Sequence, residues 1–299
     1  MNVVITGASG FVGSYMVRHF IDRGDAVTGL GRSASHPGID EPGFTWISSD
    51  TTIPGDWQRS IEQADVVVNL AGVNIFKRWN QSYKEKILKS RVLTTQNVVG
   101  GISKDKKTVL ISTSAIGFYG NRGEETLVET SDPGDDFLAR VCVAWESATA
   151  NAALKGARVV ILRFGVVLGK DGGALEKMVP AFKYFLGGPL GRGDHWFPWV
   201  HVKDIARAME FCLKNREVEG PLNMCAPGAV RQRDFATSLG RALNRPAFMP
   251  APSWAIRLIM GEMADAILAS SKAVPEGLGN AGFQFEFPGI DKALDDIVG

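Results

Sequence analysis

Cysteine and histidine are scarce in this 299-residue chain, which has three of the first and four of the second. The cysteines are far apart and form no Cys-x-x-Cys pair, so we expect free thiols in a reducing compartment. No histidine stands at metal-ligand spacing from a cysteine or another histidine, and the sequence therefore predicts no metal site. The residues concerned are Cys142, Cys212, Cys225, His19, His36, His195 and His201.

The chain also lacks an excess of charge and a long apolar run. Its formal net charge is +1, and no basic cluster points to nucleic acid or a membrane surface. No apolar run approaches the roughly 18 residues that a membrane-spanning helix needs. The first residues carry neither a basic segment nor a secretory cleavage site, so we expect a cytoplasmic protein, in the cytosol or an organelle matrix. The length suits one large α/β domain, or one domain with a smaller cap.

The first 13 residues read as a strand, a glycine turn and the start of a helix. The apolar run over residues 3–5 is typical of a buried parallel strand. Gly7 then allows a tight turn, Gly10 lets the backbone approach a pyrophosphate, and Gly13 lets the helix pack close to the strand. The phosphates are expected on free N–H groups at the helix start. The alternative is a glycine-rich surface turn. The predicted cofactor loop comprises Gly7, Ser9, Gly10, Phe11, Val12 and Gly13.

The residues after the second predicted strand, 26–30, bear on the choice of cofactor. An enzyme that uses NAD usually has an acidic residue there for the ribose 2′-hydroxyl, and this chain has Arg32 and Ser33 instead. A guanidinium pairs bidentately with a 2′-phosphate, and the serine can add a hydrogen bond. We therefore predict NADP(H) as the cofactor; the alternative is a solvated surface arginine.

The Gly-x-x-Gly-x-x-Gly spacing resembles the extended, epimerase-like branch of the short-chain dehydrogenase/reductase superfamily. In that branch an acidic residue after the third strand contacts the adenine. Asp50 is the candidate for this role here, and the alternative is that Asp50 caps a loop. On the helix predicted over residues 82–99, Arg91 stands where the branch has a residue near the cofactor. Lys86 is a second candidate there, or a solvated side chain. The turn after the fourth strand matches the branch's Asn-x-Ala-Gly pattern under the cofactor in Asn69, Leu70, Ala71 and Gly72.

The resemblance extends to the end of the fifth predicted strand. The superfamily places a serine or threonine there that polarises the substrate carbonyl, which makes Ser114 the first candidate and Thr113 the second. Its acid/base is a tyrosine with a lysine four residues later, and none of the four tyrosines here has such a lysine. Leu138 and Cys142 occupy those positions on the expected helix. Tyr119, beside the strand end, is our candidate for a surrogate acid.

The chain resembles an atypical subgroup of epimerase family proteins that lacks this Tyr-Lys pair, from residue 1 to about 297. The resemblance implies a doubly wound, parallel α/β Rossmann-like domain over residues 1–165. It implies a smaller C-terminal substrate domain over 166–299, with a family-specific unit from about 248 and some later chain returning to the first domain. The segments that carry the resemblance are Phe137–Glu146, Arg163–Gly169, Gly187–Gly191 and Trp196–Asp204.

Several expectations concern the second half. Residues 187–194 read as a loop that can close over a substrate. His201 is a candidate proton carrier, with a hydrogen-bonded structural histidine as the favoured alternative. Asp204 stands like an N-cap acid before a helix. We also expect one helix near residues 253–271, packed in the core or in a dimer interface, and an edge strand over 283–287.

Three functions fit these features. The first is an NADP(H)-dependent oxidoreductase or epimerase acting on a small hydroxyl- or carbonyl-bearing molecule, with a sugar nucleotide as one option. The second, suggested by the missing Tyr-Lys pair, is a sensor or scaffold that binds NADP(H) without chemistry. The third, a structural protein with a vestigial site, is disfavoured by the intact glycines and Arg32. We expect a small-molecule partner and a homodimer, with no nucleic acid or membrane partner.

Overall fold

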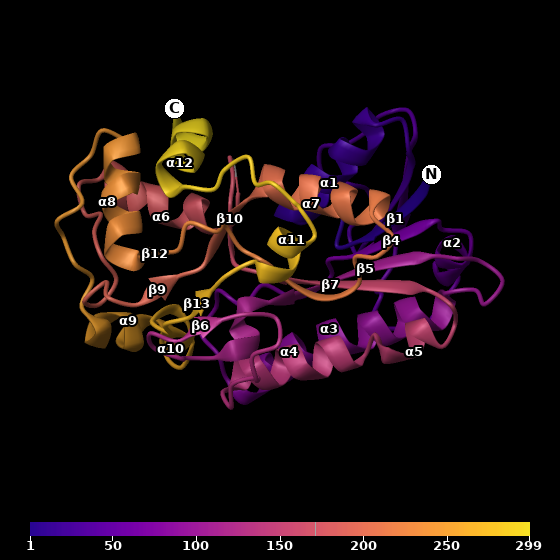
Figure 1. Ribbon diagram of the computed structural model, residues 1–299, viewed down its shortest axis with the longest axis horizontal. Coiled ribbons are helices and arrows are strands. Elements are labelled where there is room, and N and C mark those ends of the chain that lie inside the picture. Colours follow the sequence, from indigo (N-terminus) through magenta and orange to yellow (C-terminus); the bar gives the residue numbers. More distant parts are fainter. Residues whose placement is uncertain (171) are drawn as a thin grey trace.

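A seven-stranded parallel sheet forms the centre of the computed structural model, which describes residues 1–170 and 172–299 (Figure 1). Its strands lie in the order β11-β7-β5-β4-β1-β2-β3, so successive strands are added on either side of β1. This order confirms the predicted doubly wound, Rossmann-like sheet. The strands are β1 (Asn2–Thr6), β2 (Ala26–Gly31), β3 (Phe44–Ser48), β4 (Val66–Asn69), β5 (Val109–Ala115), β7 (Arg158–Phe164) and β11 (Gly220–Met224).

Helices cover both faces of this sheet, which explains why its central strands are continuous apolar runs. Val66, Val67 and Val68 of β4 are all buried, although neighbouring side chains on a strand point to opposite faces. α1 (Phe11–Asp22) and α7 (Val202–Lys214) lie on one face (Figure 1). The other face carries α2 (Gln58–Glu62), α3 (Gln81–Gly101), α4 (Phe137–Ser147) and α5 (Ala150–Ala153).

A smaller lobe follows the carboxyl ends of the strands (Figure 1). Its own hydrophobic core includes Leu168, Phe182, Trp199, Phe235 and Leu294. Later parts of the chain return to the main sheet layer. α7 and β11 belong to this layer although they follow residue 201, and Leu278 and Phe283 pack in its core. The lobe and its margin contain η1 (Ile116–Tyr119), β6 (Thr126–Leu127), β8 (Val166–Leu168), α6 (Gly173–Lys183), β9 (Trp196–Phe197), β10 (Trp199–His201), β12 (Val230–Arg231), α8 (Gln232–Ala242), α9 (Ser253–Met260), α10 (Met263–Ile267), β13 (Lys272–Ala273), α11 (Glu276–Asn280) and α12 (Ile290–Val298).

Two expected elements of the terminal unit differ in the structure. The prediction of a single helix near residues 253–271 is wrong, because the segment forms two short helices, α9 and α10, separated at Gly261. Gly261 has a φ of +61°, a left-handed conformation that ends a helix and favours glycine. The edge strand over 283–287 is also wrong, because the N–H groups of Glu286 and Phe287 donate to the Asp204 carboxylate instead of to a neighbouring strand.

The start of α7 corrects the expected role of Asp204. The N-cap is His201, whose Nδ1 accepts the Lys203 N–H at 3.1 Å. Asp204 lies in the first turn, fully buried, and receives the two N–H groups of the C-terminal segment at 2.8 and 3.0 Å. His201 is 1% exposed and its ring stacks on Phe287 at 4.0 Å, which favours the structural reading of this histidine.

Within residues 1–170 and 172–299, no helix combines the length and apolar character needed to cross a bilayer. The same part of the chain contains no group of three or more His, Cys, Asp or Glu side chains placed to hold a metal ion. All three cysteines are buried free thiols.

Candidate functional site

The glycine turn after β1 is shaped by close backbone contacts. Gly7 has a φ of +66°, and the Gly10 N–H donates to the Gly7 carbonyl at 2.9 Å. A Cβ on Gly13 would lie 2.2 Å from the Gly7 oxygen, so only glycine fits where α1 crosses the turn. No side chain caps the α1 N-terminus, which leaves its first N–H groups available to an anion. This geometry is the one that a dinucleotide pyrophosphate requires.

The other predicted members of the loop have separate surroundings. Ser9 is exposed at the tip of the turn, and Val12 is half-buried against the main core. The Phe11 ring packs on the turn before α6, where a Cβ on Gly169 would lie 2.7 Å from it. Phe11 therefore links the glycine turn to the second lobe by its side chain.

A buried polar network joins the glycine turn to the segment after β4. The Thr6 hydroxyl donates to Asn69 Oδ1 at 2.7 Å and accepts the N–H groups of Leu70 and Ala71 at 3.2 Å. A Cβ on Gly7 would lie 3.0 Å from the Ala71 backbone. The structure thus brings the two predicted cofactor segments into contact at the carboxyl edge of the sheet.

The end of β2 carries the predicted 2′-phosphate residues. Arg32 and Ser33 are both exposed, and Arg32 makes no ion pair within the described part of the chain. Asp50 lies near enough to Arg32 to be affected by its charge. Asp50 Oδ1 accepts the N–H and hydroxyl of Thr52 at 3.0 and 2.7 Å; these hydrogen bonds lower its pKa and show that it caps its own turn.

Arg91 of α3 lies against the third residue of the β4 turn. A Cβ on Gly72 would be 3.0 Å from the Arg91 Cζ. The guanidinium donates to the carbonyls of Ile87 and Val73 and lies 5.1 Å from the Trp145 ring centre, with no carboxylate among its contacts in the described residues. Burial lowers the pKa of this guanidinium. Arg91 is half-buried and has no carboxylate partner among the described residues, so a cofactor phosphate or ribose nearby is a favourable partner for it.

The Lys86 side chain makes no hydrogen bond or ion pair with this edge in the described part of the chain. It is exposed on α3, five residues before Arg91, and so about 140° round the helix from it. This position favours the alternative interpretation, in which Lys86 is a solvated side chain on the helix surface.

The hydroxyl groups of the two predicted carbonyl-polarising residues are already donating within the protein. Ser114, 2% exposed, donates to Glu146 Oε1 at 2.6 Å. Thr113, 4% exposed, donates to the Asn69 carbonyl at 2.9 Å. A hydroxyl has one hydrogen to donate, so in this arrangement neither group offers a hydrogen bond to a substrate carbonyl.

Tyr119 is placed in the core rather than at an open face. Its ring is 0% exposed, and its hydroxyl lies 2.7 Å from Asn223 Oδ1 and 3.0 Å from the Val128 carbonyl. The hydroxyl also accepts a hydrogen bond from Arg163 Nη1 at 2.9 Å. Burial raises the pKa of Tyr119, against what an acid/base near neutral pH requires. The hydroxyl of the predicted surrogate acid is therefore buried, and its hydrogen bonds are made to other groups of the protein.

The positions where the superfamily has its Tyr-Lys pair are apolar in this fold. Leu138 packs in a cluster with Met260 and Ile267 of the terminal helices. Cys142 is 3% exposed, and burial raises the pKa of its thiol to about 11. Neither side chain can exchange a proton near neutral pH, and the terminal unit covers the place where the tyrosine would stand.

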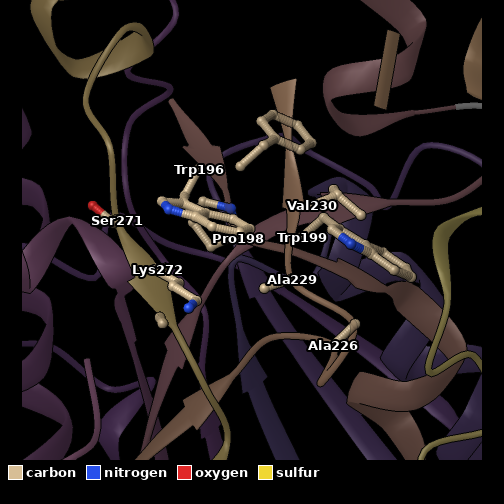
Figure 2. A pocket seen from close by; sticks show the side chains of 10 residues that line it. Trp196, Pro198, Trp199, Ala226, Ala229, Val230, Ser271 and Lys272 are labelled. Atoms are coloured by element: carbon tan, nitrogen blue, oxygen red, sulfur yellow. The ribbon is translucent and has the colours of Figure 1, made fainter. Parts of the chain in front are cut away.

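A small pocket is lined by residues of β9, β10, β12 and β13 in the second lobe (Figure 2). It has about 10 Å³ of space, enough for roughly one water molecule. Trp196 and Trp199 line opposite ends of it, and Lys272 Nζ lies 4.9 Å from the Trp196 ring centre. The Lys272 ammonium has no hydrogen bond or ion pair among the contacts of the described residues. This pocket is a candidate contact for part of a polar substrate.

Sequence reasoning missed Thr6 and Glu146, and it missed the hydrogen-bond partners of Asn69, although Asn69 itself belongs to the turn pattern given above. Thr6 and Asn69 organise the cofactor edge, and Glu146 holds Ser114, yet each partner is at least 26 residues away in the sequence. Thr6 and Asn69 had one usable signal: each ends a buried apolar strand directly before a predicted cofactor segment. No comparable sequence signal points to Lys272, in the terminal unit.

Comparison with known proteins bears directly on this arrangement. Residues 3–225 match the model of the NAD dependent epimerase/dehydratase family, and residues 251–297 match a domain of unknown function (DUF1731). The chain belongs to the NAD dependent epimerase/dehydratase family. The predicted resemblance, including a distinct C-terminal unit, is confirmed.

Relatives of this family member share its whole length. The chain is 38% identical to the Arabidopsis thaliana protein named "Epimerase family protein SDR39U1 homolog, chloroplastic", over 100% of this chain and 87% of the relative. The human epimerase family protein SDR39U1, solved with NADPH, is 31% identical with a TM-score of 0.87 and covers 100% and 99% of the two chains. MoeE5 in complex with UDP-glucuronic acid and NAD, at 21% identity and a TM-score of 0.80, covers 100% and 98% and shares the fold.

Proposed function

We propose that this family member is an NADP(H)-binding, epimerase-like oxidoreductase that acts on a small hydroxyl- or carbonyl-bearing molecule. The observation that carries the proposal is the pairing of a glycine cradle with a cation at the end of β2. The cradle excludes side chains at Gly7 and Gly13, and Arg32 supplies the free charge for a 2′-phosphate. The human relative solved with NADPH supports the same choice of cofactor.

The residues present fit the cofactor at both of its ends. The uncapped α1 N-terminus would bind the pyrophosphate, Arg32 and Ser33 would bind the adenosine end, and Arg91 beside Gly72 would provide charge further along. When bound, the cofactor supplies or accepts a hydride. The chain's own part is to hold that cofactor at the carboxyl edge of the sheet and to exclude water around the reacting carbon.

The substrate is proposed to enter from the side of the second lobe. Lys272 and Arg231 both lie over the Trp196 ring, at 4.9 and 4.5 Å from its centre. The Trp196 indole N–H donates to Glu124, and this charged, aromatic edge suits one polar group of a sugar or nucleotide. UDP-sugars bound to structural relatives such as MoeE5 support this class as one option. The pocket is too small for a whole ligand, so it would hold one group at its edge.

A second function, an NADP(H) sensor without catalysis, is favoured by one specific observation. The hydroxyl hydrogens of Ser114 and Thr113 are directed to Glu146 and to the Asn69 carbonyl, and the Tyr119 hydroxyl is enclosed. No proton carrier therefore stands at the usual place for reduction of a carbonyl. A sensor needs only the cofactor cradle, which is intact.

The deciding experiment is a fluorescence titration of the purified protein with NADPH and with NADH. We expect NADPH to bind more tightly, and Arg32→Ala to weaken NADPH by roughly ten- to a hundredfold with little change for NADH. Arg59→Ala, an exposed arginine on α2, is the matched control. Equal or absent binding of both cofactors would overturn the proposal.

A hydride-transfer screen then separates the two functions. The NADPH-loaded protein is mixed with a panel of carbonyl compounds, and the loss of nicotinamide absorbance is followed. The NADP+-loaded protein is mixed with hydroxyl compounds and UDP-sugars; the gain of nicotinamide absorbance reports net oxidation, and chromatography of the sugar products reports epimerisation. Turnover supports the oxidoreductase. A complete lack of turnover, together with a partner whose affinity differs between NADP+ and NADPH, supports the sensor.

A further inference from the structure

Three aromatic side chains connect the loop after β2 with the glycine turn. We call Phe44, Trp46 and His36 the aromatic wedge. The His36 ring lies edge-on to Phe44 at 5.4 Å and 89°, and to Trp46 at 5.2 Å and 82°. Phe44 and Trp46 come from β3, and His36 ends the exposed stretch that begins at Arg32. The wedge therefore lies between the two segments expected to bind the phosphates of the cofactor.

Two glycines of β2 make room for the wedge. A Cβ on Gly29 would lie 2.9 Å from the Phe44 ring, and one on Gly31 would lie 2.5 Å from the Trp46 ring. Neither glycine needs a left-handed backbone, because both lie within a regular strand. The strand lacks side chains at these two positions because the aromatic rings occupy the space.

Trp46 anchors the loop that carries Arg32. Its indole N–H donates to the Ser33 carbonyl at 3.0 Å. Among the described residues, this is the one hydrogen bond to the main chain between Arg32 and Pro37. Without it, the exposed loop would sample many conformations and would lose that freedom when a 2′-phosphate bound.

His36 fastens the other end of the same loop to the glycine turn. Its Nε2 lies 3.1 Å from the Ala8 carbonyl, and the Ser14 hydroxyl donates to the same oxygen at 3.1 Å. A carbonyl only accepts hydrogen bonds, so Nε2 carries the proton and Nδ1, which has no partner, is the bare nitrogen. His36 is 7% exposed, so this contact is enclosed by protein.

We propose that Trp46 and His36 are positioning residues that set the preference for NADP(H) over NAD(H). They hold the Arg32–Ser33 loop, already ordered, at a fixed place relative to the pyrophosphate turn. NADP(H) uses both the loop and the turn, whereas NAD(H) lacks the 2′-phosphate and gains less from the loop. The inference rests on the proposed function, because it concerns the same cofactor site.

The test measures dissociation constants for NADPH and NADH in matched variants by nicotinamide fluorescence. Trp46→Phe keeps an aromatic ring and removes the N–H donor; we expect the NADPH constant to rise about tenfold and the NADH constant to change less than twofold. Trp79→Phe is the control, since the Trp79 indole also donates to a main-chain carbonyl, that of Ile75, at 2.9 Å. It should change neither constant.

A second pair of variants tests the histidine. The amide N–H of His36→Gln can replace Nε2–H toward Ala8, whereas His36→Leu cannot donate. We expect His36→Leu to lower the ratio of the NADH to the NADPH dissociation constant about tenfold. His36→Gln should keep most of the wild-type ratio. A melting temperature for each variant shows that it is folded.

The outcomes separate this inference from the proposed function. If the wild-type protein binds neither cofactor, or binds both equally, the proposed function fails. If the wild type prefers NADPH and the ratio of constants is unchanged in Trp46→Phe and in His36→Leu, the inference alone is overturned. A rise in both constants by the same factor also overturns it, because that result shows a general role in folding.

Discussion

Arg163 donates two hydrogen bonds of 2.9 Å to the Glu146 carboxylate, one to each oxygen, and Ser114 donates to the same carboxylate. The Arg163 side chain is 4% exposed and that of Glu146 12%. The same arginine also holds the Tyr119 hydroxyl, so one guanidinium organises the end of β5 and the end of β7. This core ion pair therefore lies directly beside Ser114, one of the two residues predicted to polarise a substrate carbonyl.

Removing one member of that pair should strongly destabilise the protein. Glu146→Gln leaves the Arg163 charge buried without a counter-ion, and we expect a loss of about 3–5 kcal/mol in the free energy of unfolding. Urea denaturation measures it. Replacing both residues, as Arg163→Met with Glu146→Leu, should cost less than the single change. A single variant as stable as the wild type would show that the pair contributes no net stability.

Tyr119→Phe distinguishes a structural tyrosine from an acid. The variant removes a hydroxyl that contacts Asn223, Val128 and Arg163, and we expect a loss of about 1–3 kcal/mol of stability. The NADPH dissociation constant and any turnover found in the screen should stay the same at a temperature where the variant is folded. Turnover lost with the fold intact would restore Tyr119 as the acid.

Gly13→Ala should abolish cofactor binding. Its Cβ would lie 2.2 Å from the Gly7 carbonyl oxygen, so α1 must move away from the turn that binds the pyrophosphate. We expect the melting temperature to fall and the NADPH titration to show no saturation. Gly279→Ala is the control, because a Cβ there meets nothing within 4 Å and alanine is a better helix former. Normal NADPH binding by Gly13→Ala would contradict the site.

His201 should make the protein less stable in mild acid. Burial lowers the pKa of this imidazole from 6.5 to about 4, so the folded state takes up its proton later than the unfolded chain does. Stability is then lost as the pH falls below 6.5, with the loss complete near pH 4. The contribution is about 3 kcal/mol in total and about 2 kcal/mol by pH 5.

The matched variant for this prediction is His201→Asn. Asparagine can cap α7 as His201 does, but it does not titrate. Urea denaturation at pH 7.5 and at pH 5 should show a smaller difference for the variant than for the wild type. An equal difference in the two proteins would assign the acid sensitivity to other groups, such as Asp296.

Local spacing was sufficient to predict the cofactor edge, because the relevant contacts are between neighbours in sequence. The spacing of Gly7, Gly10 and Gly13 predicts the conformation of the turn after β1. The alternation of apolar strands with helices along the chain predicts the parallel sheet. The proposed role of Arg32 in binding a 2′-phosphate is also predicted locally, because Arg32 stands where an NAD enzyme has an acidic residue.

The direction of the hydroxyl groups of Ser114 and Tyr119, the predicted catalytic residues, could not be predicted from the sequence. Ser114 points to Glu146, 32 residues away, and Tyr119 to Asn223, 104 residues away. Such partners depend on how distant helices and strands pack. The alternating run at 283–287 failed for the same reason: a strand needs a neighbouring strand, and the nearest acceptor offered to this segment is the Asp204 carboxylate.

The place of β11 has a consequence for how the protein is made. This strand ends at Met224 and pairs with β7, so the sheet is complete only when about three quarters of the chain has left the ribosome. Until then β7 presents an unpaired edge with a row of free N–H and C=O groups, the kind of surface on which nascent chains aggregate. A fragment cut near residue 165 would keep that edge permanently. Engineering of this protein should therefore retain residues through Met224 whenever the cofactor domain is wanted alone.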